Sequence, residues 1–355
     1  MKHQKIQTDL NKRGLHYISR NSLFKLLEAL KTDYEVFVPV KKNERRFYKK
    51  YIQPSDDIVI GEVRPFEPLK LFFSRAREIV AKDFAPDIPH AQDRPLAIVG
   101  VKACDLKGMK VQDHVFLDHD YRDPFYAKNR EQNLIISSDC TIAIETCFCL
   151  SLGLKPYAEE GFDINLSEVD DGFIAEIGSQ KGEMLAKKYS HLFQNAAEHH
   201  QEKRELIRKG VVKEVENSIK KNEVPSQDLF KGIIERNFES DIWADEAKTC
   251  VECGACNVIC PTCHCFLLYD QKDEKKMERL RIWDSCMIKD FARVAGGANP
   301  RGKLWMRLRN RFEKKFDFFP KTADIYACTG CGRCIPACPA KIDIRKVLKR
   351  LVNNE

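Results

Sequence analysis

The sequence predicts an α+β protein built from three parts. We expect an N-terminal α/β-type domain over residues 1–180, a helical connection over residues 181–240, and a cysteine-rich C-terminal domain with a long insert over residues 241–355. Helix and strand patterns alternate in the first part, charged helical stretches fill the second, and one cysteine motif occurs twice in the third. With 355 residues, of which 43% are hydrophobic, the chain is long enough for two or three cores.

The N-terminal part opens with an amphipathic helix and a strand. Residues 22–30 (SLFKLLEAL) place leucine and phenylalanine on one helical stripe, and residues 34–40 (YEVFVPV) predict a β-strand. Further strands are predicted over residues 57–63, 95–101, 134–137 and 172–178. The second of these contains LAIVGV, an unbroken apolar run that is typical of a central strand buried on both faces.

A basic segment follows the first strand. Residues 41–50 (KKNERRFYKK) contain six basic and two aromatic residues, a composition that nucleic-acid-binding surfaces also have. The segment is short and carries no RNA-binding motif, so we favour a solvated hairpin or a loop that faces a protein partner.

Four cysteines follow predicted strands, at positions where α/β sheets present functional groups. They are Cys104, Cys140, Cys147 and Cys149. Asp105 is placed to cap a short helix beside the first of them. The four lack a ferredoxin spacing, so buried structural thiols and a zinc site are alternatives. Their number, their positions and the C-x-C pair favour a [4Fe–4S] cluster in the N-terminal domain.

The middle of the chain is predicted to be helical. From Lys181 the composition changes to long charged helices. Pro225 and Ser226 then predict the start of another helix, and its apolar face leads into the cysteine-rich part.

The C-terminal part repeats the spacing C-x2-C-x2-C-x3-C-P, which is typical of ferredoxins that bind two [4Fe–4S] clusters. In such motifs three thiolates of one loop reach one cluster, and the fourth cysteine serves the other. We therefore expect a two-cluster ferredoxin-like domain. Cluster one is assigned to Cys250, Cys253, Cys256 and Cys338, and cluster two to Cys328, Cys331, Cys334 and Cys260. Gly254 and Gly332 lie inside the loops, where unusual φ angles are expected.

Zinc and disulfides are the alternatives for these eight cysteines. A zinc knuckle needs neither the third cysteine of each motif nor the following proline, so the spacing favours iron and sulfide. The opening residues MKHQKIQTDLNKRG contain no apolar core of a secretory signal. We therefore expect a cytoplasmic protein with reduced cysteines.

A long insert, residues 261–327, separates the two motifs. It is expected to contain a charged helix, and its arginines face either cluster charge, a partner subunit or solvent. Cys263, Cys265 and Cys286 are left unassigned. A fourth cluster would need another ligand, such as His264 or a cysteine from elsewhere in the chain.

The formal net charge of +7 does not by itself indicate a nucleic-acid partner. Each all-cysteine [4Fe–4S] centre contributes a charge of about −2 in its oxidised form, so bound clusters would bring the protein close to neutrality. The apolar stretches are also far shorter than the roughly 20 residues that a bilayer span requires. We expect neither a nucleic-acid partner nor a membrane span.

Five segments together resemble a known family. They are VGVKACDLKGM, ETCFCLSLG, ECGACNVICPTCHCF, RIWDSCMIKDFARVAGGANPR and CTGCGRC. Their order is similar, over nearly the whole chain, to the iron–sulfur protein that anaerobic sulfite reductases share with cytoplasmic sulfhydrogenases, where it is the beta subunit. The resemblance implies three cluster sites on the twelve cysteines assigned above. It also implies two partners: a flavoprotein (FAD/NAD(P)H) subunit, and a terminal reductase or hydrogenase subunit.

The sequence therefore predicts an electron-transfer subunit of a multi-subunit oxidoreductase with no catalytic residues of its own. No GxGxxG or P-loop motif is present for a dinucleotide. One alternative is an iron–sulfur enzyme that reduces a sulfur compound directly at a site built from Cys263, Cys265 and Cys286. A second alternative is a zinc-based module that binds nucleic acid.

Overall fold

The computed structural model describes residues 14–83, 85–86, 94–273 and 276–354. Its largest element is an eight-stranded mixed sheet with the order β10-β1-β9-β8-β7-β6-β2-β3. The strands are β1 (Leu15–Ser19), β2 (Glu35–Lys42), β3 (Arg45–Lys50), β6 (Leu96–Val101), β7 (Leu134–Ser138), β8 (Ile164–Val169), β9 (Gly172–Ile177) and β10 (Gln194–Asn195). The central neighbours β2, β6, β7 and β8 are parallel, and the outer pairs are antiparallel.

Helices cover both faces of this sheet. On one face α1 (Arg20–Leu30) and α4 (Gln180–Lys188) pack against Ala97 and Val99 of β6. On the other face α2 (Ala103–Phe116) and α3 (Pro124–Gln132) pack against Ile98 and Val101. Strand β6 is thus buried on both sides, as its unbroken apolar run predicted.

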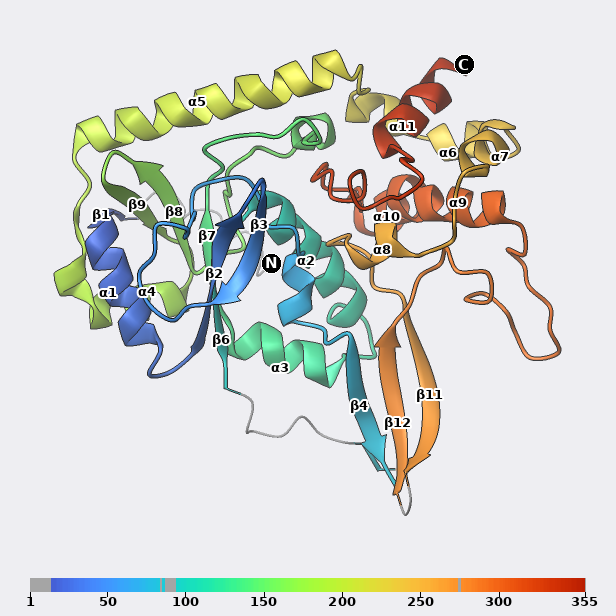
Figure 1. The fold of residues 1–355 in the computed structure, drawn as a ribbon, viewed down its shortest axis with the longest axis horizontal. Helices are drawn as coiled ribbons and strands as arrows, with labels where there is room; N and C mark the ends of the chain where they lie inside the picture. Colours follow the sequence, from blue (N-terminus) through green and yellow to red (C-terminus); the bar gives the residue numbers. More distant parts are fainter. Residues whose placement is uncertain (1–13, 84, 87–93, 274–275, 355) are drawn as a thin grey trace.

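A second sheet joins the insert to the N-terminal part. Its strand order is β11-β12-β4-β5, with β4 (Arg77–Lys82) and β5 (Ala85–Pro86) from the N-terminal part and β11 (Phe266–Asp273) and β12 (Lys276–Trp283) from the insert. Figure 1 shows this sheet projecting away from the rest of the molecule. Arg281 of β12 forms ion pairs with Glu78 of β4, at 2.5 Å, and with Asp123.

Helices surround the two cysteine motifs in the C-terminal part. They are η5 (Gln227–Phe230), α6 (Ile233–Arg236), α7 (Ile242–Ala247), α8 (Ala255–Val258), α9 (Leu304–Glu313), the π-helical turn η6 (Lys314–Phe318), α10 (Phe319–Ala323) and α11 (Ile344–Asn353). Their apolar side chains, including Trp243, Phe312 and Leu348, form one core. The long helix α5 (Glu198–Lys221) runs from the main sheet to this part of the molecule (Figure 1).

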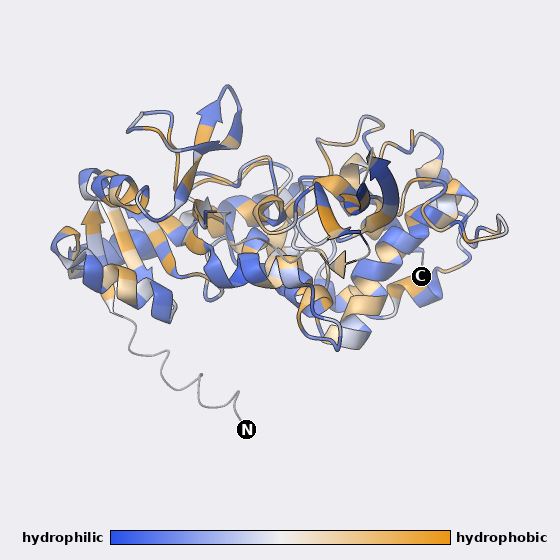
Figure 2. Cartoon of the chain, turned by 90° about the horizontal axis from the view of Figure 1, so that it is seen from below, coloured by the Kyte–Doolittle hydropathy of each residue, from blue (hydrophilic) through white to orange (hydrophobic). Residues whose placement is uncertain are grey.

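Most of the predicted elements are confirmed, including the hairpin within residues 41–50, which joins β2 to β3. Outer helices carry hydrophilic and hydrophobic residues together, as expected of helices that cover a core (Figure 2). Among the described residues, no helix combines the length and the apolar content that a bilayer crossing needs.

Three local predictions were wrong. Residues 57–63 form only a single bridge, between Val40 and Ile58, because their backbone groups bind several different segments instead of one strand. The helix expected from Pro225 is divided into η5 and α6 by Gly232, whose φ is +70°. Asp105 does not cap a helix, since Lys102 is the N-cap residue of α2 and Asp105 lies within its first turn.

Candidate iron–sulfur sites

The first cavity lies between the two cysteine motifs. It is lined by Cys250, Cys253 and Cys256 of the first motif and by Cys338 of the second. This is the set that the crossed pattern assigns to cluster one. Gly254 has a φ of +71°, and a Cβ there would lie 2.9 Å from Ser285, so the loop needs glycine for both conformation and space.

The second set comprises Cys328, Cys331, Cys334 and Cys260. Burial raises the pKa of Cys328 to about 12, and Cys334 and Cys260 lie close enough to affect it as well. The fourth cysteine of the first motif is thus placed with the second motif. Cys260 also lies beside Cys263, and their thiols are hydrogen-bonded.

Two buried cations lie among these cysteines. Lys315 is 4% exposed, and its Nζ lies 3.4 Å from the sulfur of Cys260 and 3.5 Å from that of Cys263. Burial alone would lower the pKa of Lys315, but these two cysteines outweigh that effect and raise it. Arg311 of α9 is 5% exposed and lies near cysteines of both motifs, among them Cys256 and Cys334. These cations are suited to balance the negative charge of thiolate-bound clusters.

The N-terminal cysteines line a third cavity. All four of them, Cys104, Cys140, Cys147 and Cys149, meet there, together with Cys331 of the second motif. Gly330 closes this contact, because its carbonyl accepts a hydrogen bond from the Phe148 amide at 2.9 Å and a Cβ on it would lie 2.5 Å from the backbone of Cys149. Helix α5 covers the cavity with Val211 and Val215.

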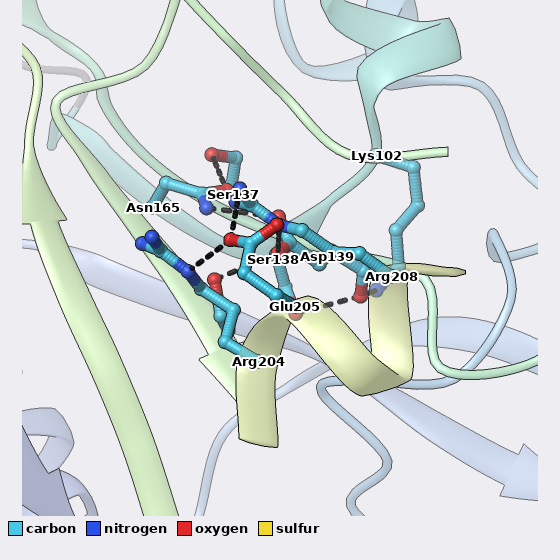
Figure 3. A network of polar contacts seen from close by, with 9 residues as sticks. Lys102, Ser137, Ser138, Asp139, Asn165, Arg204, Glu205 and Arg208 are labelled. Atoms are coloured by element: carbon cyan, nitrogen blue, oxygen red, sulfur yellow. Dashed lines mark hydrogen bonds and ion pairs between the residues drawn. The ribbon is translucent and has the colours of Figure 1, made fainter. Parts of the chain in front are cut away.

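A polar network supports the same cavity (Figure 3). The buried Lys102 lies on its wall and donates hydrogen bonds to the carbonyls of Ile60, at 2.7 Å, and Asp139, at 3.1 Å. The Asp139 carboxylate accepts hydrogen bonds from Asn165, Ser167 and Arg208 at 2.7–2.9 Å. Burial lowers the pKa of Lys102, and the nearby Cys140 and Asp139 act against that shift.

The thiols of this cavity favour metal binding over free ionisation. Burial raises the pKa of Cys140 to about 12, and it also raises those of Cys104 and Cys149. Without a metal these thiols stay protonated at neutral pH, and coordination to iron would release their protons.

A buried ion pair fixes the second motif to the N-terminal part. Arg333 and Asp105 are both 0% exposed, and their nearest charged atoms are 2.7 Å apart. The guanidinium of Arg333 also donates to the carbonyls of Pro65, Phe66 and Glu67, and Asp105 accepts from the amide of Leu69. Arg64 donates to the carbonyl of Cys331. The second motif is therefore held by residues that precede it by more than two hundred positions.

The three cysteines left unassigned lie beside cluster-one and cluster-two residues. Cys263 and Cys265 line a further cavity with His264, Lys70 and Trp283. His264 is buried, which lowers its pKa to about 4, and its Nδ1 lies 3.0 Å from the carbonyl oxygen of Thr262. Cys286 is buried at the end of the same hairpin.

The arrangement of donors fits iron–sulfur clusters better than single metal ions. Among the described residues, which include every cysteine, no three His, Cys, Asp or Glu side chains converge closely enough to hold one ion. A zinc site would bring four sulfurs to about 2.3 Å from a common centre. Here the cysteines instead surround cavities, as a larger cluster requires.

Comparison with known proteins agrees with this geometry. Residues 249–342 match the 4Fe-4S dicluster domain family. The chain is 30% identical over 338 residues to sulfhydrogenase 2 subunit beta of Pyrococcus furiosus, an alignment that covers 94% of this chain and 98% of that protein. The chain therefore belongs to the family of iron–sulfur subunits that includes this sulfhydrogenase beta subunit, as its cysteine motifs predicted.

Proposed function

We propose that this protein is the electron-transfer subunit of a cytoplasmic multi-subunit oxidoreductase in sulfite, sulfur or hydrogen metabolism. It would relay electrons between a flavoprotein subunit that handles NAD(P)H and a terminal reductase or hydrogenase subunit. Its twelve cysteines would hold three [4Fe–4S] clusters, with the third on Cys104, Cys140, Cys147 and Cys149. When bound, each cluster supplies a one-electron redox centre.

One observation carries this proposal: the three cysteine sets form a row in which neighbouring sets share a wall. Cys331, assigned to cluster two, also lines the N-terminal cavity. Cys334, assigned to the same cluster, lines the cavity of cluster one. Cluster two is therefore the middle of the row. At the far end Cys253 is exposed, which suits an exchange of electrons with a partner at the surface.

The first test is composition. Anaerobically reconstituted protein is expected to contain about twelve iron and about twelve acid-labile sulfide per chain, because three four-iron clusters have that stoichiometry. Colorimetric iron and sulfide assays, with metal analysis for zinc, give the answer. A reproducible iron content near eight would remove the N-terminal cluster, and zinc in place of iron would overturn the proposed function.

The second test concerns the crossed ligands. Cys338→Ala is expected to perturb the cluster of Cys250, Cys253 and Cys256 and to leave the cluster of the second motif bound, since the fourth cysteine serves the other motif. Electron paramagnetic resonance of the reduced protein, with iron counting, separates the two signals. If only the signal of the second-motif cluster changed, the assignment of Cys338 and Cys260 would be exchanged.

The alternative function, direct reduction of a sulfur compound, has one observation in its favour. Cys263 and Cys265 line a cavity together with Lys70, whose Nζ lies 4.5 Å from the centre of the Trp283 ring. The purified single chain, supplied with a reduced dye, distinguishes the two functions. The relay function predicts dye oxidation only by partner proteins, whereas turnover of sulfite or polysulfide by the single chain would establish the alternative.

A further inference from the structure

Two of the unassigned cysteines lie opposite one another at the base of the β11–β12 hairpin. Phe266 pairs with Trp283 at the end of the ladder, and the amide of Asp284 donates to the carbonyl of Cys265 at 2.9 Å. This brings the chain back so that the thiol of Cys265 donates a hydrogen bond to the sulfur of Cys286. Neither cysteine belongs to the twelve assigned ligands. The hairpin thus builds a dithiol from residues twenty-one positions apart.

A single buried residue connects this dithiol to cluster one. Asn257 is 1% exposed, and its Nδ2 donates to the sulfur of Cys286 at 3.1 Å. Its Oδ1 lies 3.8 Å from the sulfur of Cys256, a ligand assigned to cluster one. The path from the dithiol to that cluster therefore runs through one amide side chain, with a contact at each end.

The surroundings of the pair favour a reactive dithiol over two inert packed thiols. Hydrogen bonds from Cys265 and Asn257, with the positive charges of Lys314 and Arg311, lower the pKa of Cys286 to about 6 although burial opposes that shift. Thiolate character is what makes a cysteine reactive. Cys286 is 4% exposed, whereas Cys265 lines the cavity that also contains Lys70 and His264. The dithiol is thus sealed on the cluster side and reaches a cavity on the other.

We propose that Cys265 and Cys286 form a reversible dithiol/disulfide couple that exchanges two electrons with the clusters through Asn257. On oxidation, the two sulfurs lose their protons, one S–S bond forms, and two electrons leave. Two oxidised [4Fe–4S] clusters take up one electron each, and the protons leave by way of the cavity beside Cys265. Reduction reverses every part of this step. The proposal rests on the proposed function, because the clusters are the electron acceptors.

The experiment counts electrons and maps the bond in the full cluster-loaded chain. Protein oxidised anaerobically with a dye is titrated with titanium(III) citrate, and samples are quenched with an alkylating agent for peptide mass spectrometry. Wild-type protein is expected to take up about two electrons more than either Cys265→Ser or Cys286→Ser, since a disulfide is a two-electron couple. The peptide pair linked through Cys265 and Cys286 should be present before the titration and absent after it.

Each other outcome is decisive. Equal electron counts in wild type and both variants, with both thiols alkylated in oxidised protein, would overturn the couple and leave the proposed function intact. Wild-type iron near sixteen that falls by about four in the variants would show that these cysteines bind a fourth cluster instead. Absence of iron would overturn the proposed function itself. Direct peptide mapping of wild-type protein decides the matter even if a variant fails to fold.

Discussion

Replacing Cys104 with serine is expected to reduce NAD(P)H-dependent turnover of the assembled complex to the background rate. Cys104 is one of four cysteines around the N-terminal cavity, which is one end of the row of cysteine sets. A relay with its end removed cannot connect the two partners, although each partner keeps its own chemistry. The dye-linked activities of the flavoprotein and terminal subunits should therefore stay unchanged. Steady-state assays of the three activities provide the comparison.

The matched control for this variant is Lys110→Ser on the same helix, α2. The Lys110 side chain is 43% exposed and pairs with Glu160 at the surface, so its loss should leave turnover unchanged. Iron analysis must first show that Cys104→Ser has lost one four-iron cluster. Unchanged turnover after that proven loss would take the N-terminal cluster off the electron path.

Replacing Asp105 with alanine is expected to lower the free energy of unfolding by about 3–5 kcal/mol, because it leaves the buried guanidinium of Arg333 without its counter-charge. The backbone carbonyls around Arg333 remain, but none of them carries a negative charge. Denaturant-induced unfolding of the anaerobic protein, followed by circular dichroism, measures the loss.

Two further variants show whether the buried charge is the cause. Asp105→Ala combined with Arg333→Met removes both charges and should be more stable than Asp105→Ala alone. Lys50→Ala removes a partner from an exposed pair, in which Lys50 is 61% exposed, and should cost no more than about 1 kcal/mol. A double variant no more stable than the single one would mean that packing, and not charge, dominates at this position.

The cysteine sets and the central strand could be predicted because their signals are local. The spacing of Cys250, Cys253 and Cys256 is itself a coordination pattern, and the apolar run over residues 96–101 states its own burial. Gly254 was predicted to adopt an unusual φ for the same reason, and its φ is +71°. The partner of these three, Cys338, could be named only because the pattern of crossing is general to such motifs.

The parts that escaped prediction depend on contacts between distant segments. Strand β12 is rich in charged residues and has no strand-like alternation, yet it is a strand because β4 pairs with it. The pairing of Cys265 with Cys286 becomes visible only once this hairpin exists. The arginines of α9 were expected to face cluster charge, a partner or solvent, and only the structure shows that Arg311 lies among the cysteines.

The placement of Cys338 in the first cavity also governs when the protein can mature. A ribosome makes residues 250–260 long before residues 328–338, so neither of the two crossed cages has its four thiols until synthesis is nearly finished. Iron and sulfide must therefore be delivered to an almost complete chain. Until then eight thiols remain without their intended metal, and a cell that makes this protein must protect them from zinc, copper and oxidants throughout translation.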